Sequence, residues 1–450
     1  MKAEERQQML ANAPIPGLVI RLSIPTIISM LVTSLYNMAD TFFVGQISTS
    51  ATAAVGVVFP LMAIIQAFGF FYGHGSGNTI SRKLGAGQTE EARHLSSCGY
   101  YLALFTGILF GAICFLFVQP LSRVLGSTDT ILPYTISYMR IIVLGAPAVM
   151  GSFVLNNQLR FQGFALYSMI GMTFGGILNI FLDPLLIFYF EMGITGAAVA
   201  TVFSQTLSML LLLLLCRRCQ ALPHRLSDLK YLGSTIAPIC GGGFPSLCRQ
   251  GLASISTIAL NLAAKPYGDA AIAAMSIVTR IMMFANSATI GFGQGFQPIC
   301  GFNYGAGNKK RVLEAFWFCM KLTTSVLLVA AIAAFIFSPN LVAVFRRNDP
   351  DVTRIGALAL RAQCITLPLC GWIILNNMLF QTIGYTLPAS ILASSRQGVC
   401  FLPLILILPL IFGLTGVQIA QAGADICSFL LALYLHKTKL KDFYLATKHS

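Results

Sequence analysis

The chain has 450 residues, of which 56% are hydrophobic and only 10% are charged. Soluble domains carry about 25% charged residues, so this composition excludes an ordinary soluble protein. Apolar runs of about 20 residues recur along the sequence and indicate a membrane protein with many spans. The formal net charge of +14 does not indicate nucleic-acid binding, because Lys and Arg are spread over short loops instead of clustering on one helix.

Twelve hydrophobic spans are predicted in chain order. They cover residues 18–43, 51–75, 95–118, 134–157, 165–188, 193–216, 238–262, 270–295, 314–337, 353–378, 388–410 and 413–436. The first run is too long for the core of a signal peptide, so it is interpreted as a span. Most Lys and Arg fall at every second connection and near the two ends, which predicts that both termini are cytoplasmic.

The sequence matches itself at an offset of 220 residues. The Leu-Asn-Asn run at 155–157 recurs at 375–377, and the Gly-Ala-Gly run at 85–87 recurs at 305–307. A repeat with an even number of spans enters the membrane in the same direction each time, so the repeats are expected to be parallel. We therefore expect an N-terminal lobe at 1–216, a cytoplasmic linker at 217–233 that is solvated, and a C-terminal lobe at 234–450.

Two acidic residues in the first half are the strongest functional candidates, since a charge in hydrocarbon costs about 2.5–3.5 kcal/mol on insertion scales. Asp40 and Asp183 are expected at similar depth near the outer ends of two spans, where they can meet. Tyr36 is four residues before Asp40 and Asn179 is four before Asp183, so each acid shares a helical face with a polar group. Thr201 is expected at the same depth, completing an oxygen-rich cluster.

This cluster allows three interpretations. Two carboxylates in a low-dielectric site cannot both ionise cheaply, so one would take up and release a proton near neutral pH. Alternatively, the oxygens of Asp40, Asn179, Asp183 and Thr201 would bind Na⁺, or each acid would cap a hydrated helix end. Pro25 and Pro184 each remove a backbone donor and predict helix kinks beside the cluster, although prolines are also tolerated in membrane helices without such a role.

The second half has not kept these acids: Leu260 and Pro403 stand at the matching positions. It carries other ionisable residues within predicted spans, namely Arg249, Arg280, Arg361, Arg396 and Asp425. Pairing among these residues is expected, and an anionic cargo is the alternative.

Motifs for catalysis or nucleotide binding are not found in the sequence. The glycines at 73–77 and 85–87 lack the strand and the Lys-Ser/Thr pair of a phosphate loop, so they indicate helix termination and close packing, and no ATP is expected. The five histidines form no cluster with Ser or Asp, and the twelve cysteines form no disulfide framework. We therefore expect no enzyme activity and no cofactor.

The chain resembles the multidrug and toxic compound extrusion transporters, in particular the bacterial DNA-damage-inducible-type and staphylococcal multidrug-type branch. The resemblance rests on the duplicated layout and on four motifs: Ile24-Pro25-Thr26, Asp40-Thr41-Phe42-Phe43-Val44-Gly45, Gly85-Ala86-Gly87 and Asn179-x-x-x-Asp183-Pro184. It implies a V-shaped pair of lobes that exports amphipathic, often cationic, drugs in exchange for H⁺ or Na⁺. A multi-pass monomer in the bacterial plasma (inner) membrane, with small amphipathic substrates and membrane lipids as partners, is expected.

The resemblance also implies roles for single residues. Asp40, Asn179, Asp183 and Thr201 would form the coupling-cation site, and Pro25 would bend in response. Asn156 and Tyr36 are expected to line the substrate cavity, although the predicted span places position 156 toward the cytoplasmic side. A flippase for lipid-linked saccharides, a sister type of similar architecture, is the alternative, in which basic residues of the second half would bind pyrophosphate.

Overall fold

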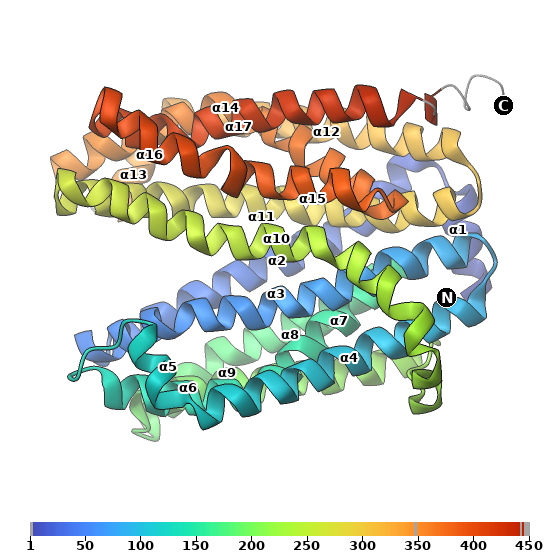
Figure 1. Ribbon diagram of the computed structural model, residues 1–450, viewed down its shortest axis with the longest axis horizontal. Helices are drawn as coiled ribbons and strands as arrows, with labels where there is room; N and C mark the ends of the chain where they lie inside the picture. The colour runs from blue at the N-terminus through green and yellow to red at the C-terminus, as the bar shows by residue number, and fades with distance from the viewer. Residues whose placement is uncertain (1–2, 346–348, 442, 445–450) are drawn as a thin grey trace.

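The computed structural model describes residues 3–345, 349–441 and 443–444, and these residues are almost entirely helical (Figure 1). The first half contains α1 (Ala3–Asn12), α2 (Ile15–Gly45), α3 (Thr49–Gly85), α4 (Thr89–Leu116), α5 (Val118–Val124), α6 (Leu132–Leu144), α7 (Ala146–Phe161), α8 (Ala165–Pro184), η1 (Leu185–Tyr189) and α9 (Gly193–Arg218). After η2 (Leu226–Tyr231), the second half contains α10 (Leu232–Ala264), η3 (Lys265–Tyr267), α11 (Asp269–Gly305), α12 (Lys309–Ile336), α13 (Ser338–Phe345), α14 (Pro350–Ile383), α15 (Thr386–Ser394), η4 (Ser395–Val399), α16 (Phe401–Phe412) and α17 (Leu414–Lys439).

Each of the predicted spans corresponds to one helix or to two or three consecutive helical elements. In the described part of the chain, ten stretches are long and apolar enough to cross a membrane, and α6 with α7, bent by 47°, makes an eleventh. The twelfth is α10, which has 33 residues and occupies the position that repeats α2. It is less apolar because its middle carries Ser246, Arg249 and Gln250.

The helices α3 and α11 have 37 residues each and continue well past the predicted ends of their spans. The prediction that Gly73–Gly77 terminate a helix is wrong, because these residues lie inside α3. The chain turns instead after Gly85, where Gly87 has a φ of +75°, and after Gly305, where Gly307 has a φ of +77°. The close packing predicted for these glycines is present and outweighs their low helix propensity.

Glycine allows the two halves to touch along four long helices, since α3 packs on α10 and α11 packs on α2. A Cβ atom at Gly75 would overlap the carbonyl oxygen of Ile239. A Cβ atom at Gly85 would overlap the carbonyl oxygen of Phe302, and a Cβ atom at Gly305 would overlap the carbonyl oxygen of Arg82. Gly85 and Gly305 are repeat partners that make reciprocal contacts, as expected for two parallel repeats related by a two-fold axis.

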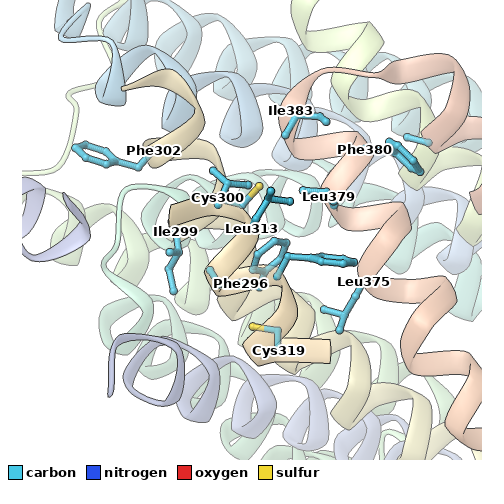
Figure 2. Close-up of a cluster of buried hydrophobic side chains, with 14 of the residues drawn as sticks. Phe296, Ile299, Cys300, Phe302, Leu313, Cys319, Leu375, Leu379, Phe380 and Ile383 are labelled. Atoms are coloured by element: carbon cyan, nitrogen blue, oxygen red, sulfur yellow. The ribbon is translucent and has the colours of Figure 1, made fainter. Parts of the chain in front are cut away.

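A hydrophobic core joins the halves at the end of the molecule where α3 and α11 finish. It includes Leu18, Ile80 and Ile239 together with a large cluster from α11, α12 and α14. Figure 2 shows part of that cluster, in which Phe296 and Cys300 of α11 lie on the side of α14 that carries Leu379. The helix groups α2–α9 and α10–α17 lie on opposite sides of this contact (Figure 1).

The segment between α9 and α10 is packed against the first half. Asp228 is 2% exposed, accepts a hydrogen bond of 2.8 Å from Ser97 and pairs with Arg93 at 3.3 Å. His224 Nε2 lies 2.8 Å from Gln158 Oε1, and burial lowers the pKa of this imidazole to about 4. The prediction of a solvated connector is therefore wrong for His224 and Asp228, because α4 and α7 offer them polar partners.

Candidate functional site

Three of the predicted cluster residues are joined by hydrogen bonds between α8 and α9. Asn179 Nδ2 donates to Asp183 Oδ1 at 3.2 Å and to Thr201 Oγ1 at 3.4 Å. Asn179 and Asp183 lie one turn apart on α8, which gives them the common face that their spacing predicts. Asp183 is fully buried.

Asp40 of α2 belongs to the same site. It is 8% exposed, and its carboxyl group interacts electrostatically with that of Asp183. The interpretation of both acids as hydrated helix caps is wrong, since neither carboxylate faces solvent. Asp40 Oδ1, Asp183 Oδ2 and Asn179 Oδ1 are buried without a hydrogen-bond partner among the described residues. Unpaired acceptors of this kind are stabilised by a bound proton or by a small cation.

Two tyrosines complete the surroundings of the acids. Tyr36 is buried, interacts electrostatically with Asp40 and packs on Gly176 of α8, where a Cβ would be 3.2 Å from its ring. Tyr138 of α6 is also buried and interacts with both Asp40 and Asp183. Tyr138 was not predicted, because a tyrosine in an apolar span carries no distinctive sequence signal and only the fold brings it to the acids.

The two prolines beside the site have different surroundings. The helix α2 continues through Pro25 without a break. The next residue, Thr26, donates from its hydroxyl to the carbonyl oxygen of Gly291 in α11 at 2.6 Å. Pro184 ends α8, and the π-helical turn η1 follows directly. Asp183 therefore lies one residue from a change in helical geometry, whereas Pro25 lies at a contact between the halves.

A small cavity lies on the inner face of the first half, between α2, α3, α7, α8 and α11. Asn156 lines it and donates from Nδ2 to Ser168 Oγ at 2.7 Å. Phe70, Phe153 and Met172 supply apolar walls. Arg160 also lines this cavity; it was missed because the predicted span ends at position 157, whereas α7 continues to Phe161.

The buried acid of the second half has a different environment. Asp425 accepts a hydrogen bond from Arg396 Nε at 2.7 Å and another from Thr366 at 3.2 Å, so the expected internal pairing is confirmed for Arg396. Arg361 donates to Ser338 Oγ at 2.8 Å. Arg249 is not paired with Asp425, and its guanidinium lies 3.5 Å from Asn377 Oδ1.

Parallel helical repeats are a feature of secondary transporters, and the first repeat adds two buried carboxylates without a cationic partner among the described residues. The model of the MatE family matches residues 25–185 and 245–407, one stretch in each half. The chain belongs to this family, whose members are transporters and not enzymes.

Relatives of known name and solved structures agree with this assignment. Multidrug export protein MepA of Staphylococcus haemolyticus is 27% identical over 424 residues, covering 94% of this chain and 93% of the relative. The protein of the same name from Staphylococcus saprophyticus is 27% identical and covers 98% of each chain. The structure of MATE in complex with MaL6 has a TM-score of 0.92 and 26% identity, covering 97% of this chain and 99% of that one.

A further solved structure, an outward-facing multidrug resistance MATE family transporter, has a TM-score of 0.90 and 26% identity, covering 97% of this chain and 98% of that one. The predicted family is thus confirmed. So is the predicted fold of twelve transmembrane helices in two parallel repeats that form a V-shaped transporter.

Proposed function

We propose that the protein is a monomeric antiporter of a bacterial cell membrane, which exports small amphipathic compounds in exchange for H⁺ or Na⁺. Export is supported by the relatives named multidrug export protein. The ion exchange rests on one observation: Asp40 and Asp183 are buried together in the first half and have no cationic partner among the described residues. Asn179 and Thr201 supply further oxygens for the ion, and no cofactor is needed.

The helix α2 is the element through which ion binding would reach the other half. It carries Asp40 and also three hydroxyl groups that contact α11. Thr26 donates to Gly291 O at 2.6 Å, Ser23 donates to Phe292 O at 3.3 Å, and Ser34 Oγ lies 2.9 Å from Ser287 Oγ. A proton or Na⁺ that neutralises the carboxylates would let α2 shift toward α8, and these contacts would then have to break or re-form.

The ion is identified by imposing the two gradients separately. The purified protein is reconstituted into lipid vesicles, and the vesicles are loaded with a fluorescent amphipathic dye. Movement of the dye across the membrane is then followed under either a pH gradient or a sodium gradient. We expect one gradient to drive dye transport and the other to have little effect. Dye transport under neither gradient would contradict the antiport proposal.

Substitution of the acids tests the site itself. Asp40→Asn and Asp183→Asn should each reduce gradient-driven transport by at least about tenfold, because an amide cannot exchange a proton or neutralise Na⁺. Asp129→Asn is the matched control, since Asp129 pairs with Arg123 at the surface and its side chain is 86% exposed. Full transport by both buried variants would exclude these acids as the coupling site.

A further inference from the structure

Arg160 is a buried cation with only neutral partners. It is 1% exposed and lies in α7, where it lines the small cavity of the first half together with Gln294 of α11. Its guanidinium donates to Gln294 O at 2.9 Å, to Gln297 Oε1 at 3.2 Å and to Asn157 Oδ1. In the part of the chain that the structure describes, it forms no ion pair.

A second cation and a histidine lie beside it. The guanidinium of Arg249 in α10 is close enough to repel that of Arg160, and its hydrogen-bond partner is the amide of Asn377 at 3.5 Å. His74 of α3 is 1% exposed and interacts electrostatically with both arginines. We call Arg160, Arg249 and His74 the cationic centre.

The cationic centre has hydrogen-bonding capacity that the described residues do not use. Arg160 Nε and Gln297 Nε2 are buried donors without a partner, and His74 Nε2 is buried and unpartnered as well. An isolated buried charge is costly unless it is paired. In the second half of this chain, Arg396 is paired with Asp425 at 2.7 Å, whereas neither Arg160 nor Arg249 forms an ion pair with an acid among the described residues.

We propose that the cationic centre binds the carboxylate or phosphate group of an amphipathic substrate. Arg160, the member of the centre that lines the small cavity, offers a charged hydrogen bond at its wall. The cavity holds only about 10 Å³ of free volume in this structure, so the halves have to separate before Phe70, Phe153 and Met172 can offer an apolar surface to the rest of the molecule. The ring of Phe70 stacks on His74 at 5.3 Å, which joins the apolar wall to the charged end. The preferred cargo is then an amphipathic anion or zwitterion and not a simple cation.

An anion at this position would also act on the contact between the halves. It would compete with Gln294 and Gln297 of α11 for the guanidinium of Arg160, so substrate binding would weaken a contact that closes the cavity. The proposed cargo class rests on the proposed export function. Anion binding at the cationic centre, however, can be measured without an ion gradient.

The test compares two dyes that share one apolar body and differ only in charge. Purified full-length protein in detergent is titrated with a carboxylate dye and with its neutral methyl ester, and binding is followed by fluorescence. The unchanged protein should bind the carboxylate at least about tenfold more tightly, a difference of about 1.4 kcal/mol. Arg160→Gln should remove this preference while binding the ester normally, and Arg160→Lys should keep part of it.

Arg82→Gln is the matched control. Arg82 also joins the halves, through a 2.7 Å hydrogen bond to Thr382 O, but it does not line the cavity. It should keep the preference for the carboxylate. If Arg160→Gln weakens both dyes equally, or changes neither, Arg160 only holds the halves together and the proposal is wrong.

Two further measurements distinguish a lipid from a soluble anion, and distinguish the anion-binding proposal from the antiport proposal. Displacement of the carboxylate dye by a polyprenyl pyrophosphate would support the cationic centre with a lipid phosphate as cargo, whereas displacement by water-soluble amphipathic carboxylates alone would support it with a soluble cargo. Carboxylate binding that depends on Arg160, without gradient-driven transport in vesicles, would contradict the antiport and leave the binding centre standing.

Discussion

Buried charged residues are handled differently in the two halves. Asp40 and Asp183 interact electrostatically, and each has a buried oxygen without a hydrogen-bond partner among the described residues. Asp425 is held by Arg396, Thr366 and Gln421, the last donating at 3.1 Å. A buried carboxylate that is paired with a guanidinium has its charge compensated, whereas a buried carboxylate without a cationic partner does not. This difference supports our proposal that the coupling ion binds in the first half.

The Arg396–Asp425 pair gives a prediction about stability. Asp425→Ala should lower the free energy of unfolding by about 3–5 kcal/mol, because the guanidinium is left buried and uncompensated. Asp351→Ala is the control: its pair with Arg354 is exposed at the surface, and its loss should cost about 0–1 kcal/mol. Both are measured by denaturation in detergent.

A double variant separates charge from packing. Replacing both partners, as Asp425→Leu with Arg396→Met, should recover most of the stability, since no charge then remains buried. A double variant as unstable as Asp425→Ala would show that the hydrogen bonds to Thr366 and Gln421, and not the charge, are what the single change destroys.

The sequence allowed part of this site to be predicted. Asp40 and Asp183 stand out as charges in apolar runs, and helical spacing places Asn179 beside Asp183. Arg160 could not be found in this way, because it follows polar residues that end the apolar pattern, and two of its three hydrogen-bond partners come from α11. Tyr138 is found only once α6 is folded against the acids. Periodicity describes one helix, and these residues depend on contacts between helices.

Helix ends were also harder to predict than helices. Every span was found, but α3 and α11 extend past their expected ends because glycines that weaken an isolated helix strengthen one that is packed against another backbone. The same reasoning applies to the chain between α9 and α10, whose polar residues are buried by contacts with α4 and α7. In both cases a tertiary contact overrides the local signal.

The glycine contacts between α3 and α10 give a prediction about conformation. Gly75→Ala would push a methyl group into the carbonyl oxygen of Ile239 and should destabilise this contact by about 1–3 kcal/mol. Distances between spin labels on α3 and α10 should widen, and dye transport should fall. Gly251→Ala in α10 is the control, because a methyl group there meets nothing within 4 Å; the label distances and dye transport should both stay unchanged. Unaltered label distances in Gly75→Ala would show that α10 accommodates the methyl group without moving away from α3.

At the scale of the whole molecule, the even number of spans places the two ends of the chain together. The helix α1 and the end of α17 lie at the same end of the molecule (Figure 1). The last turn of α17 carries His436, Lys437 and Lys439, and α3 carries Arg82 and Lys83 in its last turn at that end. Basic residues gather on the cytoplasmic side of membrane proteins, so we expect this end of the molecule, with both termini, to face the cytoplasm.

Fusions to the C-terminus test this orientation. A fluorescent protein that folds only in the cytoplasm should be bright, and an alkaline phosphatase that folds only outside should be inactive, because we expect both termini inside. The same pair of reporters fused within the loop between α5 and α6, for example after Asp129, should give the opposite result. An active phosphatase at the C-terminus would reverse the topology.

The Arg396–Asp425 pair has a consequence for the membrane voltage. Moving one elementary charge across a membrane potential of 100 mV changes the free energy by about 2.3 kcal/mol. Because the acid of the second half is bound to its own counter-charge, loading and unloading of carboxylates alters the charge of the first half only. The voltage would then favour one orientation of the ion-loaded transporter through Asp40 and Asp183, so that the electrical part of the driving force enters through a single half.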